Sequence, residues 1–209
     1  MFAPAVFRAE PRVDLMIKIP VVVLMGFGST FLLADTDRGV DLYNQGKYAQ
    51  AQSELAKAVE SSPDDARARR FLGLALVEQH KPAEAQEHLA KANELDPSGN
   101  SKLALARMYI EQKDFDKAED LLKDAEGEDL NYVRGLLQLN RGQNKEAAES
   151  LESYLKDHPN HPYAHYYAGL AYNGAKRPDK MLTHFETFTR IKPDAPEAKK
   201  VRAVLSTGR

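Results

Sequence analysis

The sequence predicts an all-α protein built from stacked helix-turn-helix units. From residue 35 onward, apolar residues recur at i, i+4 and i+7, which places them on one face of a helix, and the alternation typical of a strand is missing. The pattern also repeats, because equivalent residues of five successive helices are separated by 34, 33, 29 and 34 residues: Ala51, Ala85, Ala118, Ala147 and Met181. A period of this length is typical of a solenoid, in which each unit buries its apolar face against the next.

The composition excludes several classes of function. The chain has 29 Lys and Arg residues against 31 Asp and Glu residues, so no large positive field is available to attract nucleic acid or an acidic bilayer surface. Cysteine is absent, which excludes disulfides, a thiol nucleophile and thiolate metal ligands. We therefore expect no nucleic-acid partner.

Residues 1–34 differ from the rest of the chain. No charged residue occurs between Ile19 and Ala34, and Lys18 precedes this apolar run. A 16-residue helix spans about 24 Å, less than the roughly 30 Å of a bilayer's hydrocarbon core. A basic start, a short apolar run and a small residue before a polar segment favour a secretory signal peptide that is cleaved after Ala34.

Two alternatives to cleavage stay open for this leader. Residues 19–34 would otherwise serve as an N-terminal membrane anchor or as a buried leading helix. Met16 is a better start than Met1, because Met-Ile-Lys gives a compact basic region before the apolar run. We expect export, most simply to the bacterial periplasm, or anchoring to the cytoplasmic membrane if the leader is not cleaved.

Residues 35–193 form the repeat region. Each unit has a small residue at one position of its first helix, and most units have a glycine or lysine at the turn and a proline at the end. The residues that carry this pattern are Gly39, Gly73, Ala106, Gly135 and Gly169; Leu42, Leu76, Tyr109 and Tyr172; Gly46, Lys113 and Gly142; and Pro63, Pro97, Pro159 and Pro193. Together with the Ala-Leu-Ala rows of the second helices, they resemble the tetratricopeptide repeat family over about residues 33 to 193. The resemblance implies a right-handed superhelical solenoid of about five repeats.

The junction between the third and fourth units departs from the pattern. It is about five residues short and has no closing proline. We expect Gly127 to end the preceding helix and the superhelix to be locally broken there. Arg134 and Gln138 fall where the fourth unit should have apolar residues, which leaves the register of that helix uncertain.

The fifth unit and the residues after it also differ. Met181 and Phe188 replace both small alanines of the second helix, which indicates contact with the last helix rather than with another repeat. Residues 194–209 are expected to form a C-terminal capping helix and tail, with the helix running from Pro196 to about Leu205 and capped by Asp194. A solenoid needs such a cap at its open end.

The histidines are the only residues that point toward chemistry. His161 and His165 lie at i and i+4, with His158 just before them, and two imidazoles on one helical face can share a zinc ion. No third ligand is marked by the sequence, so we interpret them as partly exposed residues at a repeat junction. We expect no catalytic residue, no metal and no cofactor, and we predict that the protein is not an enzyme.

The resemblance also implies which residues face a ligand on the concave side. Leu74 and Leu103 are among these ligand-facing positions. Ten residues are the candidates for partner binding: Tyr43, Asn44, Arg67, Arg70, Val77, Arg107, Tyr132, Asn140, Tyr166 and Asn173. Asparagine can donate to and accept from a peptide backbone, and arginine can hold a carboxylate. Some family members hold acidic chaperone tails with a Lys-Asn-Asn-Lys-Arg set. The matching positions here are Thr36, Val40, Phe71, Asn100 and Leu103, so that function is excluded.

The sequence therefore predicts a non-catalytic scaffold or adaptor that binds a peptide or helix of a partner protein, in a bacterial envelope assembly. A second hypothesis is a membrane-anchored structural subunit that self-associates through Phe185, Phe188 and the terminal helix.

Overall fold

The computed structural model describes residues 36–207, which are helical and contain no strand. Residues 36–44 form the first helix, and ten helices follow it: α2 (Tyr48–Ser61), α3 (Ala66–Glu78), α4 (Pro82–Leu95), α5 (Gly99–Glu111), α6 (Phe115–Lys123), α7 (Leu130–Asn140), α8 (Asn144–Asp157), α9 (Pro162–Gly174), α10 (Pro178–Ile191) and α11 (Ala198–Thr207). They form five antiparallel pairs and one final helix, which confirms the predicted all-α repeat array.

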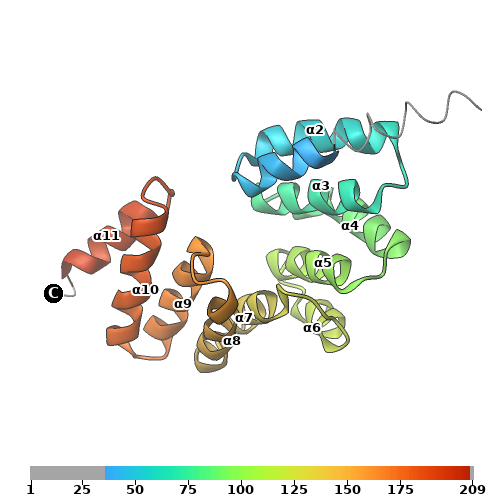
Figure 1. Cartoon of the computed structure of the whole chain (residues 1–209). Coiled ribbons are helices and arrows are strands. Elements are labelled where there is room, and N and C mark those ends of the chain that lie inside the picture. Colours follow the sequence, from blue (N-terminus) through green and yellow to red (C-terminus); the bar gives the residue numbers. More distant parts are fainter. Residues whose placement is uncertain (1–35, 208–209) are drawn as a thin grey trace, which may run out of the picture.

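The pairs stack in chain order and the stack is curved. Each helix packs on the next, and α3, α5, α7 and α9 also pack on one another in succession. Figure 1 shows the resulting arc, with α2 and α3 at one end and α10 and α11 at the other. The first helices of the pairs line the inner side of the arc.

Close approach of the two helices in a pair explains the repeated small residue. A Cβ atom placed on Gly73 would lie 2.4 Å from Leu89 Cγ, and one on Gly169 would lie 2.4 Å from Phe185 Cδ1. Gly39 and Gly135 meet Leu55 and Leu151 in the same way. The fourth repeat therefore has the same register as the others. Gln138 is accommodated in it because its side chain accepts a hydrogen bond of 2.7 Å from the Ser150 hydroxyl.

The turn inside every repeat contains one residue with positive φ. These residues are Gly46, His80, Lys113, Gly142 and Lys176, with φ values of 74°, 58°, 63°, 76° and 59°. The turn thus has one backbone geometry in all five repeats, although only two of them supply the glycine that favours it.

The core consists of two clusters that meet at α5. Leu103, Ala106 and Ile110 belong to the cluster of repeats three to five, whereas Leu105 and Met108 belong to the cluster of repeats one to three. Helix α5 therefore joins the two halves of the array through different faces.

The third repeat is irregular, as predicted, but its second helix ends earlier than expected. Helix α6 has nine residues and stops at Lys123, whereas the second helices of the other repeats have 14. Gly127 does not end this helix; it lies in the connection to α7 with φ 135°, and its carbonyl accepts from the Leu130 amide. The connection folds back onto α5, because a Cβ on Gly99 would lie 1.6 Å from the carbonyl oxygen of Glu126.

Helix α11 covers the end of the array, as the sequence predicts. Phe188 is fully buried, and it shares a core cluster with Ala198 and Val201 of α11. The helix begins at Ala198 rather than at Pro196, since residues 193–197 form turns in which the Ala195 carbonyl accepts from the Ala198 amide.

The curvature brings the first and last repeats close together. A Cβ placed on Gly46, in the first turn, would lie 3.5 Å from the Lys192 ammonium at the end of α10. That ammonium also lies 4.7 Å from the centroid of the Tyr163 ring in α9. One edge of the concave side is therefore narrow.

The predicted leader, residues 1–34, lies outside the described residues. Within the part that is described, none of the helices has the length and apolar character needed to cross a membrane.

Candidate functional site

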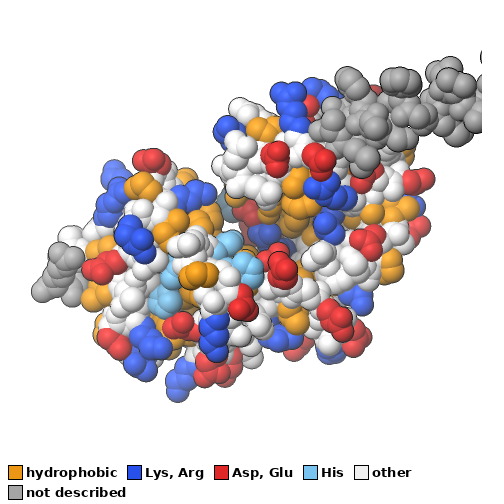
Figure 2. Space-filling model, viewed as in Figure 1, with side chains coloured by type: hydrophobic (Ala, Val, Ile, Leu, Met, Phe, Trp, Pro, Cys, Tyr) orange, Lys and Arg blue, Asp and Glu red, His pale blue; other side chains and the backbone are white. Residues whose placement is uncertain are grey.

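A cavity of about 250 Å³ lies on the concave side between the first helices of repeats one to four. Apolar groups from α3, α5 and α7 line it, together with polar groups at its margins. The lining residues are Tyr43, Asn44, Arg70, Phe71, Leu74, Asn100, Leu103, Ala104, Arg107, Asp129 and Val133. In the space-filling view, basic and acidic side chains gather in the hollow between the two arms of the arc (Figure 2).

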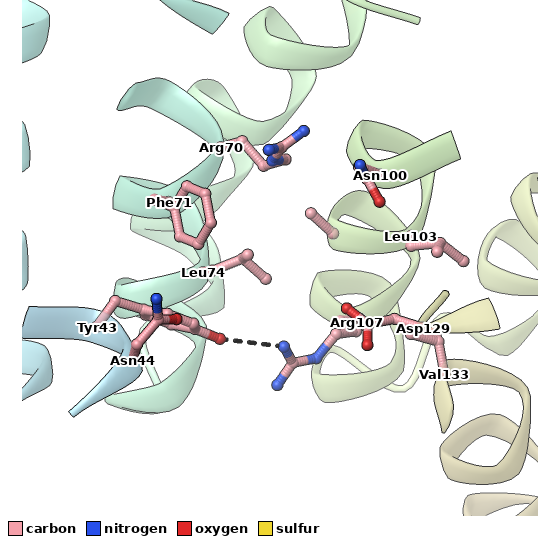
Figure 3. Close-up of a pocket in the computed structure, with 11 residues that line it drawn as sticks. Tyr43, Asn44, Arg70, Phe71, Leu74, Asn100, Leu103, Arg107, Asp129 and Val133 are labelled. Carbon is pink, nitrogen blue, oxygen red and sulfur yellow. Dashed lines mark hydrogen bonds between the residues drawn. The ribbon is translucent and has the colours of Figure 1, made fainter. Parts of the chain in front are cut away.

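Arg70 is one of two arginines that line this cavity. Its side chain reaches from α3 across the opening toward the start of α5, where Asn100 is exposed (Figure 3). The guanidinium lies over the Phe71 ring, 5.3 Å from its centroid, and within residues 36–207 it forms no ion pair with a carboxylate. Burial lowers the pKa of Arg70. The group is thus partly desolvated and suited to an incoming anion.

Arg107 has a different role, because its guanidinium is used inside the protein. It forms an ion pair with Glu78 at the end of α3 and donates a hydrogen bond of 3.2 Å to the Tyr43 hydroxyl (Figure 3). It also lies 5.8 Å from the centroid of the Tyr132 ring. Burial raises the pKa of Tyr43, which keeps that hydroxyl protonated. One side chain therefore connects repeats one to four at the base of the cavity.

The structure brings four of the ten predicted binding residues together in the cavity: Tyr43, Asn44, Arg70 and Arg107. The other six lie elsewhere. Arg67 is exposed and paired with Asp37, and Val77 is buried in the core of repeats one to three. Tyr132 is buried against Tyr154, His161 and Tyr167.

The remaining three predicted residues are in the C-terminal half. Asn140 is exposed at the end of α7, where it donates to the Leu136 carbonyl at 2.9 Å. Asn173 is exposed near the end of α9. Tyr166 is half-buried, with its ring 5.1 Å from that of Phe188. Partner binding by these residues stays a prediction.

Five cavity residues were not among the sequence candidates: Phe71, Asn100, Ala104, Asp129 and Val133. The repeat spacing contained the signal that would have identified them. Phe71, Ala104 and Val133 are separated by 33 and 29 residues, as are Arg67, Asn100 and Asp129. The cavity is thus formed by equivalent positions of successive repeats.

The histidines do not form the pair that a shared zinc ion would need. His161 Nδ1 accepts the Ala164 amide hydrogen at 3.0 Å and so caps α9, and its ring packs between Tyr132 and Tyr154. His165 instead contacts His184 of α10. Among the described residues, no three His, Asp or Glu side chains converge into a set that could hold a metal ion.

The structure also bears on the alternative hypothesis, in which the chain self-associates through Phe185 and Phe188. Phe185 and Phe188 are 4% and 0% exposed, because they fill the space between α9, α10 and α11. They stabilise the end of the array and are not available to a second copy of the chain.

These features define a helical-repeat protein whose inner surface carries a small mixed cavity. Two family models described as tetratricopeptide repeat match the chain, one over residues 36–100 and 132–203 and the other over residues 76–139. The chain belongs to the tetratricopeptide repeat family. Proteins of this family generally act as scaffolds for protein–protein interaction and are typically non-catalytic.

Solved structures show the same fold at low sequence identity. The pilF protein of Pseudomonas aeruginosa is 18% identical with a TM-score of 0.62, and the match covers 87% of this chain and 90% of that one. A thermophilic repeat protein of Thermus thermophilus is 21% identical with a TM-score of 0.69, and the match covers 85% of this chain and 98% of that one. A human IFIT1 dimer with PPP-AAAA is 18% identical with a TM-score of 0.72. The match covers 83% of this chain but only 45% of that one. Among curated proteins, no significant sequence match was found.

Proposed function

We propose that this protein is a non-catalytic adaptor that binds a segment of a partner protein in its concave groove, within a bacterial envelope assembly. The observation that supports the proposal is the cavity at the first helices. It combines apolar walls, exposed amides at Asn44 and Asn100, and the partly desolvated cation of Arg70. Buried apolar contacts with a few polar groups that fix orientation are what a peptide site requires.

The size of the cavity favours a narrow occupant. A volume of about 250 Å³ accommodates one or two side chains of a peptide rather than a whole helix about 10 Å across. We therefore infer an extended segment, with an apolar side chain between Leu74 and Leu103 and an acidic group near Arg70.

The decisive variant is Arg70→Glu, because the side chain faces the cavity and among residues 36–207 it forms no ion pair that the substitution would break. Arg107→Glu is unsuitable, since it would place a second carboxylate beside Glu78 and unfold the site. Arg69→Glu is the matched control: it makes the same charge change on α3, but its guanidinium is turned to the Pro63 carbonyl.

The experiment compares envelope proteins recovered by the wild type, Arg70→Glu and Arg69→Glu. The expected result is a partner that is retained by the wild type and by Arg69→Glu and lost by Arg70→Glu. Equal recovery by all three proteins would contradict the groove assignment.

Export is a separate part of the proposal, and it is supported by the basic residue and apolar run at Lys18 to Ala34. Under this proposal the mature protein is periplasmic, or it is held at the cytoplasmic membrane by residues 19–34. N-terminal sequencing of the native protein distinguishes these forms, since a cleaved chain starts at Asp35.

A further inference from the structure

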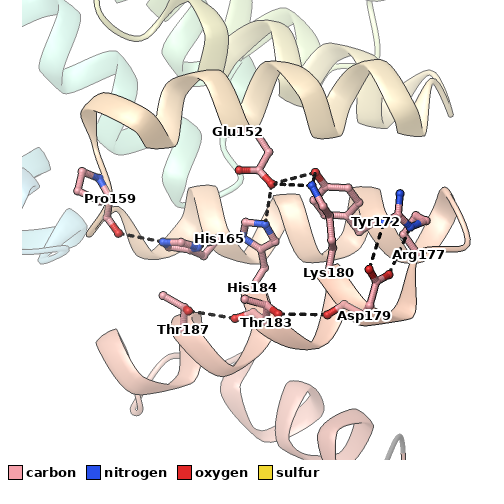
Figure 4. A network of polar contacts seen from close by, with 10 residues as sticks. All are labelled: Glu152, Pro159, His165, Tyr172, Arg177, Asp179, Lys180, Thr183, His184 and Thr187. Atoms are coloured by element: carbon pink, nitrogen blue, oxygen red, sulfur yellow. Dashed lines mark hydrogen bonds and ion pairs between the residues drawn. The ribbon is translucent and has the colours of Figure 1, made fainter.

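A continuous row of polar contacts joins the fourth and fifth repeats (Figure 4). It starts at the Pro159 carbonyl, 3.0 Å from His165 Nε2 in α9. His165 Nδ1 lies 3.0 Å from His184 Nδ1 in α10. His184 Nε2 in turn lies 3.3 Å from Glu152 Oε1 in α8. The row contains three contacts and therefore needs three hydrogens.

The first hydrogen has a fixed position. A backbone carbonyl can only accept a hydrogen bond, so the contact with Pro159 requires the hydrogen to be on His165 Nε2. In the neutral ring this leaves His165 Nδ1 as an acceptor with a free lone pair.

The hydrogen at the other end is fixed by Glu152. Burial raises the pKa of this carboxyl, but the hydrogen bond from Tyr172 and the contacts with His184 and Lys180 outweigh it and lower the pKa overall. The carboxylate is ionised and only accepts, which places the second hydrogen on His184 Nε2. His184 Nδ1 is then also an acceptor in the neutral ring.

The two Nδ1 atoms would thus face each other at 3.0 Å without a hydrogen between them. Two neutral imidazoles carry two N–H groups, one fewer than the three contacts require. A single additional proton completes all of them.

We propose that His165 and His184 form a proton-binding site that takes up one proton between the two rings. The shared charge faces Glu152 from α8, Tyr172 from α9 and Lys180 from α10. A second proton is excluded, because two imidazolium rings at this separation would repel each other in a partly buried site.

The repeat packing does not require these residues. His165 corresponds by the repeat spacing to Arg69, Lys102 and Asn131, and His184 corresponds to Glu54, His88, Leu121 and Ser150. Only the fifth repeat brings two histidines together, within the described part of the chain.

The proton is taken up on acidification. Burial lowers the pKa of His184, and the nearby Glu152 opposes this by favouring the charged form of the ring. Once bound, the proton links α8, α9, α10 and the segment before α9. This segment leads directly to Tyr163 and Tyr166 at the C-terminal side of the groove.

The test follows the ring nitrogens of ¹⁵N-histidine-labelled full-length protein by NMR from pH 8 to pH 4.5, with EDTA present. The expected result is one joint transition, in which the resonances of His165 and His184 change together and the pair gains one proton. In His184→Gln the joint transition is lost. His80→Gln, which removes an exposed histidine from the α3–α4 turn, leaves it unchanged.

Circular dichroism establishes that the variants are folded, and His165→Gln provides a second variant if His184→Gln is not. The proposal is overturned if the two rings titrate independently, if both become fully charged, or if both stay neutral to pH 4.5. A transition that appears only after zinc is added would instead identify a metal site.

Discussion

At the scale of single residues, Arg107 shows how one side chain stabilises several repeats. Its guanidinium is paired with Glu78 and hydrogen-bonded to Tyr43, and it lies beside the Tyr132 ring. The resemblance to the repeat family implies that Arg107 faces the groove, and it was therefore predicted as a ligand-binding residue. The sequence does not reveal that Glu78, 29 residues earlier, would neutralise it.

Glu78→Ala is expected to lower the free energy of unfolding by about 2–4 kcal/mol, because it leaves a largely buried guanidinium without its counter-charge. Urea denaturation measures this change. The double variant Glu78→Leu/Arg107→Met should recover most of the loss, since an apolar pair no longer contains an unpaired charge. A double variant less stable than Glu78→Ala would show that the pair is not the cause.

His161 makes stability dependent on pH. Burial lowers its pKa from 6.5 to about 4, and the neutral ring is needed because Nδ1 accepts the Ala164 amide hydrogen. The unfolded chain takes up this proton as the pH falls below about 6.5, whereas the folded chain does so only near pH 4. The neutral His161 ring therefore contributes fully to the free energy of unfolding above pH 6.5. About 3 kcal/mol of this contribution is lost as the pH falls to 4.

His161→Asn tests this contribution, because asparagine also caps a helix but does not titrate. The variant should lose about 1 kcal/mol at pH 7 through missing ring contacts. Its stability should then vary less than that of the wild type between pH 6.5 and pH 4. Denaturant unfolding at several pH values measures the slope.

At the scale of elements, the turn inside each repeat requires a left-handed residue. Gly142 gives the clearest measure of this requirement, because a Cβ placed there would meet nothing within 4 Å. Any cost of Gly142→Ala therefore comes from its φ of 76° and not from a clash.

Gly142→Ala should lower the free energy of unfolding by about 1 kcal/mol, and Gly142→Asn by less, because asparagine tolerates this conformation better. Thermal or urea unfolding measures both. Equal stability of the alanine variant and the wild type would show that the turn can change its backbone geometry.

The sequence predicted the irregular third repeat from its spacing but not the end of α6. Gly127 is a strong helix-ending residue, yet the helix stops at Lys123. The reason is tertiary: the connection folds back against Gly99 and its neighbours in α5, and this contact is formed across repeats. By contrast, the contact of Gly73 with Leu89 follows the repeat, because the two helices of a unit approach closely at the equivalent position in the other repeats too.

At the scale of the whole molecule, the concave cavity was predicted as a surface but not in its detail. The resemblance to the repeat family implied that Arg70 and Tyr43 lie on the concave side. Whether a row residue is exposed depends on the curvature of the stack, which buries Val77 and Tyr132 and leaves Asn100 open. Curvature is set by the sum of many packing contacts and is not readable from one repeat.

Removal of α11 by truncation after Lys192 should destabilise the fifth repeat. It exposes Phe188, which is now fully buried, and each large apolar side chain exposed costs about 1.5–3 kcal/mol. The truncated protein should bind a hydrophobic dye and unfold at a lower temperature. Lys200→Ser, a change on the exposed side of the same helix, should alter neither property.

The approach of the first turn to the end of α10 affects how the chain loses its structure. In an open solenoid each repeat touches only its neighbours, so the terminal repeats can fray one after another. Here Gly46 lies beside Lys192, and Tyr43 reaches Arg107 two repeats away, so neither end is independent of distant repeats. The array should therefore melt as one cooperative unit, and a partner segment would enter the groove from its open side rather than by separation of the ends.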